Sequence, residues 1–120
     1  YKELIGGNEI KVFEDVWFNP LSMYNLCKMI ELVVEKKNRG VFNLGSSHAM
    51  NKAEFALQFA KTLNLSTANM KKICVSTAKF LNAYRPRHMI MNITKFEKKY
   101  NIKLPKLAEE IKLTAKEYIK

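Results

Sequence analysis

Residues 40–60, GVFNLGSSHAMNKAEFALQFA, contain the pattern that decides the fold class. The short apolar run VFNL at 41–44 predicts a buried strand, and the Gly-Ser-Ser that follows predicts the turn that ends it. Asn51 and Glu54 have the N-x-x-E spacing of a helix-capping box. An apolar stripe typical of an amphipathic helix follows at Phe55, Ala56, Phe59, Ala60 and Leu63. A strand, a turn and a helix in this order favour an α/β fold over an all-helical one.

The preceding residues add a strand and a helix. EIKVF at 9–13 alternates and is rich in β-branched and aromatic residues, which predicts a short strand. A loop or irregular extended stretch follows at 14–22. Ser22 is placed to cap a helix that runs to about Lys37. The apolar residues that we expect on its buried face are Leu26, Ile30, Val33 and Val34.

The second half of the chain is more helical. Residues 66–72 favour an added helical turn, and 73–80 favour an extended segment. The R-P-R sequence at 85–87 is predicted to be extended, because a residue before proline avoids the helical region. Two helices are expected at the end, one over 92–100 and one over 105–119, where Pro105 suits a first turn. The sequence thus predicts short strands with about four helices.

Length and composition indicate one ordinary globular domain over residues 1–120. Hydrophobic residues make up 48% and charged residues 27%, so neither disorder nor a disulfide scaffold is indicated. No run approaches the roughly 18 apolar residues of a membrane span, and no signal peptide begins the chain. These observations predict a cytoplasmic protein without a membrane partner.

Histidines and cysteines are too scattered to suggest a metal site. His48, His88, Cys27 and Cys74 have no partner at the two-to-four spacing of zinc ligands. We therefore expect no metal, and we expect both cysteines to be small buried hydrophobic residues.

The net charge of +10 is confined to one half of the chain. Residues 1–60 hold seven basic against seven acidic residues, whereas residues 61–120 hold fourteen against four. A basic half suits a polyanion such as a nucleic acid, a nucleotide diphosphate or an acidic neighbouring domain. The simpler alternative is a solvated surface, because several lysines fall on outward helix faces, namely Lys98, Lys99, Lys106, Lys112 and Lys116. No recognition helix, RNA-binding aromatic pair or zinc finger is apparent, which disfavours a nucleic-acid-binding module.

YNLCK at 24–28 has the Y-x-x-x-K spacing of the tyrosine and lysine used by carbonyl reductases. Such a pair needs a nicotinamide beside it, and a dinucleotide site needs a glycine-rich turn between a strand and a helix. The four glycines, Gly6, Gly7, Gly40 and Gly45, do not form that turn. We therefore expect Tyr24 and Lys28 on a solvated helix, with no catalytic residue and no cofactor site in this chain.

The first residues suggest that something precedes them. The chain begins with Tyr1, and YKELIGG looks like the last turn of a helix closed by glycine. A thin sheet of two predicted strands would also normally continue in another domain. We therefore expect the chain to be a fragment whose N-terminal part is missing.

Four stretches carry a resemblance to a known family: DVWFNPLS at 15–22, GVFNLGSS at 40–47, NKAEFALQFA at 51–60 and AYRPR at 83–87. Their order and spacing resemble the C-terminal domain of dTDP-4-dehydrorhamnose reductase and its relatives among the extended short-chain dehydrogenases that act on nucleotide sugars. The resemblance covers nearly the whole chain.

The departures from that family pattern concern the substrate. Glutamine commonly follows the aspartate, where this chain has Val16, and a glycine is replaced by Phe18. Threonine commonly follows the proline, where Leu21 stands here, and the histidine of the short strand is replaced by Asn43. These changes leave the family intact but leave the nucleotide and the sugar open.

The resemblance implies that residues 1–120 are the C-terminal substrate-binding domain of an NAD(P)H-dependent nucleotide-sugar reductase. The intact protein would reduce a 4-keto sugar for dTDP-rhamnose and surface polysaccharide biosynthesis. NADPH or NADH and the working Tyr-Lys pair would lie in the missing N-terminal Rossmann domain. The alternatives are a non-catalytic regulatory homologue that binds a protein partner, and the lobe of a nucleotide-sugar epimerase.

Five residues are candidates for contact with a nucleotide-diphosphate sugar. Arg85 is the first choice for the diphosphate and Arg87 the second, because guanidinium pairs bidentately with phosphate oxygens. Trp17, Phe18 and Asn19 could line the sugar or base pocket. The alternatives are that Arg85 pairs with an acid such as Asp15, and that the two aromatic residues are core facing the absent domain. The latter predicts an exposed apolar patch through which a homodimer could form.

Overall fold

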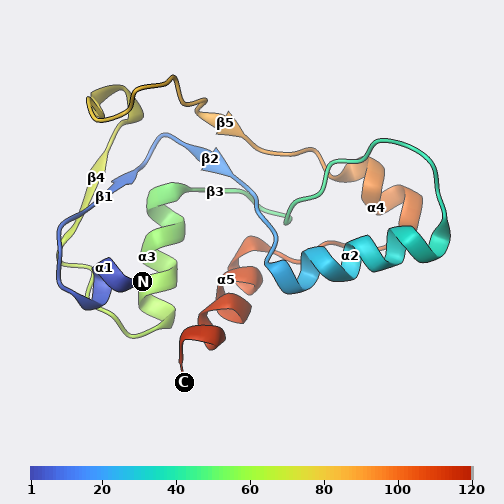
Figure 1. Cartoon of the computed structure of the whole chain (residues 1–120), viewed down its shortest axis with the longest axis horizontal. Coiled ribbons are helices and arrows are strands. Elements are labelled where there is room, and N and C mark those ends of the chain that lie inside the picture. The colour runs from blue at the N-terminus through green and yellow to red at the C-terminus, as the bar shows by residue number, and fades with distance from the viewer. Residues whose placement is uncertain (120) are drawn as a thin grey trace.

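A computed structural model describes residues 1–119 and shows two small sheets along one side of the molecule, with the longer helices beside them (Figure 1). The α-helices are α1 (Lys2–Ile5), α2 (Met23–Lys36), α3 (Lys52–Thr62), α4 (Thr94–Tyr100) and α5 (Leu107–Ala115). The strands are β1 (Ile10–Phe13), β2 (Trp17–Phe18), β3 (Met50–Asn51), β4 (Met70–Ile73) and β5 (His88–Met89). Short 3-10 helices cover Val75–Thr77 and Lys116–Tyr118. The fold is α/β with short strands, as the sequence predicted.

Each sheet joins segments that are far apart in the sequence. β1 pairs in parallel with β4, with Ile10 opposite Met70. β2 is the central strand of the second sheet, antiparallel to β3 and parallel to β5. The second sheet therefore draws the middle and the late part of the chain to the segment that follows β1.

The two longest helices begin where the sequence predicted. The Ser22 side chain accepts from the backbone N–H of Asn25 and caps α2. Asn51 and Glu54 form the complete capping box of α3, with distances of 2.8 and 3.1 Å. These caps pair backbone N–H groups that a helix end otherwise leaves without partners.

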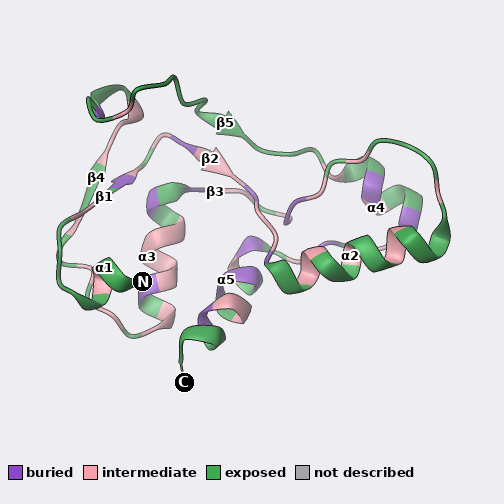
Figure 2. Cartoon of the chain, in the orientation of Figure 1, coloured by how far each residue is buried: buried purple, intermediate pink, exposed green. Residues whose placement is uncertain are grey.

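The core is divided between two places, which Figure 2 shows as separate buried segments. One group centres on Phe96, Tyr100 and Leu104, against which α2 and the stretch after it pack. The other lies between α3 and α5 (Figure 1). Its buried residues are Ala53, Ala60, Leu107, Ile111 and Ala115.

The molecule is flat and open. Its dimensions are 47 × 37 × 21 Å, and its radius of gyration is 16.3 Å, against about 14 Å for a compact chain of this length. Its accessible surface is 8516 Å², roughly 1,800 Å² more than a compact monomer of its mass exposes. Among the exposed apolar side chains are Ile30, Val34, Val41, Met89, Ile90 and Met91. Exposed apolar side chains in this number suit contact with another protein surface.

Three sequence predictions about secondary structure were wrong. Residues 41–44 form no ladder; Phe42 and Leu44 instead pack against the Phe96 cluster, and Val41 is 85% exposed. Residues 70–73 are strand β4 rather than helix, because β1 supplies a pairing edge. Beyond Ile73 the chain turns into the 3-10 helix at Val75–Thr77 instead of staying extended.

Two predictions about burial also failed. On α2, Met29, Leu32 and Val33 face the core cluster, whereas Ile30 and Val34 are exposed. Cys27 is exposed and Cys74 is half-buried, so neither cysteine is a core residue.

The five lysines that we expected on outward helix faces are exposed. In residues 1–119, no helix is long and apolar enough to cross a membrane, and no group of three or more metal-ligating side chains gathers.

Candidate functional site

The candidate site lies where β2 pairs with β5. The backbone N–H of Trp17 donates to the carbonyl oxygen of Arg87 at 2.7 Å, and Trp17 stands opposite His88 in the parallel pair. This pairing places the segment that begins at Asp15 beside the R-P-R segment at 85–87. The structure therefore brings together two of the stretches that the sequence singled out.

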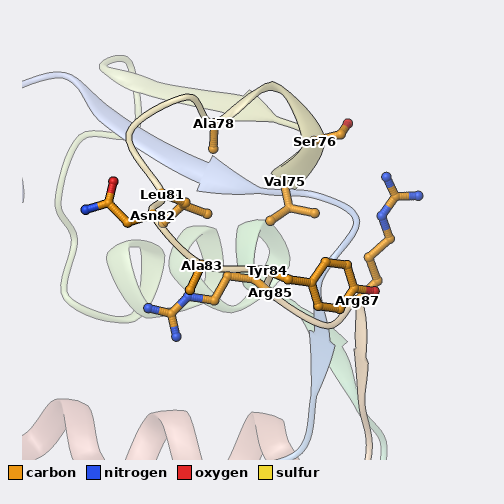
Figure 3. Close-up of a pocket in the computed structure, with 9 residues that line it drawn as sticks. All are labelled: Val75, Ser76, Ala78, Leu81, Asn82, Ala83, Tyr84, Arg85 and Arg87. Atoms are coloured by element: carbon orange, nitrogen blue, oxygen red, sulfur yellow. The ribbon is translucent and has the colours of Figure 1, made fainter.

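An open hollow of about 400 Å³ lies beside this junction (Figure 3). One wall is the 3-10 helix that begins at Val75, and the other is the segment that ends at Arg87. Side chains that line it include Val75, Ser76, Leu81, Tyr84, Arg85 and Arg87. The hollow thus combines apolar side chains with two permanent cations.

Asp15 connects the two walls of the hollow. Its Oδ1 atom accepts from the backbone N–H of Val75 at 2.8 Å, and its Oδ2 atom lies 3.3 Å from Nε of Arg87. The alternative in which Arg85 pairs with Asp15 is wrong, because the pairing of β2 with β5 brings Arg87, and not Arg85, next to the segment that holds Asp15. Arg87 is the arginine held by the carboxylate.

Arg85 lines the hollow without such a partner. It forms no ion pair with any of residues 1–119. Figure 3 shows its guanidinium group on the opposite side of the segment from that of Arg87. The two arginines therefore offer their charges at different places on the hollow.

Asn19 is a buried residue whose side chain links two backbone segments that are distant in the sequence. It is 5% exposed, and its side-chain amide donates to the carbonyl oxygens of Ser46 and Met91 at 2.9 and 3.0 Å. Its Oδ1 atom accepts from the backbone N–H of Met91 at 2.8 Å. The side-chain amide of Asn19 therefore has hydrogen-bond partners in the backbone on both sides. Gly45 packs so closely against Asn19 that a Cβ at position 45 would stand 2.6 Å from the Asn19 carbonyl oxygen. Asn19 holds the chain after β5 rather than lining the hollow.

Trp17 and Phe18 are half-buried on β2. The Phe18 ring packs against Phe55 with ring centroids 5.3 Å apart, and Lys52 Nζ lies 5.7 Å from the Phe18 centroid. Neither aromatic residue is among those that line the hollow. Both lie on β2, the strand that pairs with β5 directly after Arg87.

The Tyr24 and Lys28 pair lies on the solvated surface of α2, with Lys28 Nζ 4.5 Å from the tyrosine ring centroid. Among residues 1–119, no glycine lies between a strand and the start of the helix that follows it, which is where a glycine-rich dinucleotide turn stands. Gly6 and Gly7 follow α1, Gly40 follows α2, and Gly45 is packed against Asn19. We therefore derive no hydride-transfer step from this chain.

Sequence reasoning missed three features of the site. The wall at Val75 and Ser76 had been expected to be extended, and Tyr84 and Asp15 had no assigned role in a pocket. The adjacency of Asp15 to a predicted strand end was the available signal, because side chains at strand ends often gather at one edge of a sheet.

The fold defines the chain as a small α/β domain with an open hollow beside the β2–β5 junction. The chain belongs to the family described as the RmlD substrate binding domain, whose model matches residues 2–120. This match confirms that the chain is related to the substrate-binding region that the sequence motifs resembled.

Solved structures share the fold at low sequence identity. A dTDP-4-dehydrorhamnose reductase from Bacillus anthracis, in complex with NADP, is 18% identical with a TM-score of 0.88; the match covers 97% of this chain and 41% of that one. The counterpart from Clostridium acetobutylicum is 17% identical with a TM-score of 0.87, covering 99% and 43%. A dTDP-glucose 4,6-dehydratase from Bacillus anthracis, in complex with NAD, is 15% identical with a TM-score of 0.76, covering 98% and 37%. The chain thus spans about two-fifths of the length of these enzymes. A search of curated protein sequences found no match.

Proposed function

We propose that this chain is the substrate-binding part of an NAD(P)H-dependent nucleotide-sugar reductase that reduces a 4-keto sugar. The observation that carries the proposal is the hollow bordered by Arg85 and Arg87, on a lobe of the RmlD substrate binding domain family. The family match favours a reductase over a dehydratase or epimerase that uses the same kind of lobe.

The proposed ligand is the diphosphate of a nucleotide sugar. Both arginines are exposed at the hollow, where guanidinium N–H groups can donate to phosphate oxygens in pairs. The net charge of +10 would also draw a dianionic ligand toward the lobe. Trp17 and Phe18 are proposed to contact the sugar or base beside the hollow, and Asn19 to hold the surrounding chain.

The reducing equivalent would come from NADPH or NADH on a separate dinucleotide-binding domain. The part of this lobe in the reaction is to bind and orient the nucleotide sugar. Support for such a domain as partner comes from the open shape and from the exposed apolar side chains of α2 and residues 89–91. Residues 41–44 give further support, because their alternating burial resembles that of a strand whose pairing edge is open to such a domain.

Titration of the 120-residue chain with dTDP, UDP and GDP tests the proposal. Trp17 is the single tryptophan, so its fluorescence reports on ligands beside β2, and calorimetry supplies the dissociation constant. At least one nucleotide diphosphate should bind. Arg85→Ala should lower the affinity for it by roughly tenfold, because a hydrogen bond to a charged group contributes about that much.

Arg39→Ala is the matched control for that titration. Arg39 is the one other arginine in the sequence. It is exposed, follows the end of α2 and is not among the residues that line the hollow. Its replacement removes the same charge and should leave the affinity within about twofold, because exposed charges act only weakly at a distance. No binding of any of the three nucleotides at millimolar concentration would contradict the proposed function.

A further inference from the structure

Asp15 stands out because its carboxylate makes two contacts that meet at the hollow from opposite sides. Val75 supplies the backbone N–H on one wall, 60 residues away in the sequence. Arg87 supplies Nε on the other wall, at 3.3 Å from Oδ2. Because both of these residues line the hollow, one side chain outside the lining sets the relative position of its walls.

We propose that Asp15 is the positioning residue of a diphosphate site and that it acts through Arg87. This inference rests on the proposed function. Contact at Nε holds the plane of the guanidinium group and leaves both terminal nitrogens, Nη1 and Nη2, able to donate. A planar group held in this way can take two phosphate oxygens at once, which is the geometry of bidentate recognition.

A role in stability alone explains the arrangement less well. The side chains of Arg87 and Asp15 are 51% and 21% exposed, and partly exposed ion pairs contribute little to folding. Fixing a flexible arginine before a ligand arrives has a larger effect on ligand affinity than on folding stability, because binding then does not have to order that side chain. Asp15 is therefore expected to matter more for anion affinity than for unfolding.

The sign of one substitution separates positioning from simple electrostatics. Asp15→Asn removes a negative charge beside the proposed anion site, so on electrostatic grounds alone pyrophosphate should bind more tightly. If Asp15 positions Arg87, the same substitution should weaken pyrophosphate and dTDP binding by roughly tenfold. Asparagine keeps an oxygen that can accept from Val75, so the wall at the 3-10 helix is retained.

Glu14→Gln is the matched control. Glu14 is the adjacent residue and is exposed; within residues 1–119 its carboxylate forms no ion pair and accepts only from Cys74 Sγ, at 3.8 Å. This control removes one negative charge at nearly the same place. Its pyrophosphate affinity should stay equal to or slightly above that of the unaltered chain, and its melting temperature should stay unchanged.

A double-substitution cycle shows whether Asp15 acts through Arg87. Arg87→Lys keeps the charge but lacks the planar fork. If the proposal holds, Asp15→Asn should cost no further affinity for pyrophosphate in the Arg87→Lys background, because the group it positions is gone. Independent losses that multiply would overturn it and indicate that Asp15 acts through Val75.

The remaining outcomes also decide the matter. Unchanged or tighter pyrophosphate binding by Asp15→Asn, while the unaltered chain binds dTDP, overturns the inference and leaves the proposed function standing. Failure of the unaltered chain to bind dTDP, UDP, GDP and pyrophosphate overturns both the inference and the proposed function.

NMR supplies a test that needs no ligand. In the free chain, the Nε–H proton of Arg87 should exchange slowly with water, and in Asp15→Asn its exchange should be fast. Equal exchange rates in the two proteins would also overturn the inference.

Discussion

Glu110 in α5 accepts a hydrogen bond from the backbone N–H of Ser22, the residue that caps α2, across 88 positions of sequence. The other carboxylate oxygen accepts from the side-chain amide of Asn25. Glu110 is 3% exposed, so this contact between the last long helix and the start of α2 is shielded from water. It joins the part of the molecule that holds α5 to the part that holds α2.

Glu110→Ala should therefore destabilise the chain by about 2–3 kcal/mol, because hydrogen bonds to a buried charged group are lost and the backbone N–H of Ser22 is left without its partner. Chemical unfolding followed by circular dichroism measures the change. Glu117→Ala is the control, since Glu117 is exposed and should change stability by less than about 0.5 kcal/mol. Equal effects of the two substitutions would contradict the assigned role of Glu110.

The capping box of α3 predicts a smaller loss. Asn51→Ala removes the acceptor for the backbone N–H of Glu54, at 2.8 Å, and should cost about 1 kcal/mol. Asn51→Asp keeps an acceptor at the helix N-terminus and should retain most of the stability. Thermal unfolding of the two variants checks the order, and an alanine variant as stable as the aspartate variant would show that the cap is not needed.

Glu97 predicts a dependence of stability on pH. The backbone N–H of Leu104 donates to its carboxylate and, with a smaller contribution from Lys103, lowers its pKa below the ordinary value of 4.5, although partial burial opposes the shift. A lowered folded-state pKa means that the ionised form stabilises the fold. This contribution is present above the unfolded pKa and is lost as the pH falls through the folded one.

Unfolding of the unaltered chain and of Glu97→Gln between pH 7 and pH 3 measures that contribution. The glutamine variant should be less stable at pH 7, and the difference should shrink as the pH falls below about 4. A difference that stays constant over this range would show that the Glu97 charge is not responsible.

Neighbouring positions on α2 should respond in opposite ways to a charge. Val33 packs against the Phe96 cluster, so Val33→Lys should destabilise the chain by about 2 kcal/mol or more. Ile30 is 51% exposed, so Ile30→Lys should change stability by less than about 0.5 kcal/mol and should raise solubility. Melting temperatures and sedimentation of both variants test this. Strong destabilisation by Ile30→Lys would mean that this face is covered in the chain studied.

Local sequence determined those features that depend on residues close to one another. The α2 and α3 starts follow from Ser22 and from Asn51 with Glu54, because a cap needs only a side-chain oxygen within three residues of the N–H that it accepts. The first strand follows from alternation over four residues. The α/β class and the relation to a substrate-binding domain could be read in the same way, since they rest on the order of such segments.

Tertiary structure decided where a choice depended on a distant partner. Residues 41–44 have the pattern of a strand but no ladder among residues 1–119, whereas 70–73 became a strand because β1 lies beside them. Arg85 and Arg87 are alike in sequence, and only the pairing of β2 with β5 selects Arg87 as the partner of Asp15. A ladder or an ion pair needs two segments within a few ångströms, and that proximity depends on the packing of the whole chain rather than on the type of either residue.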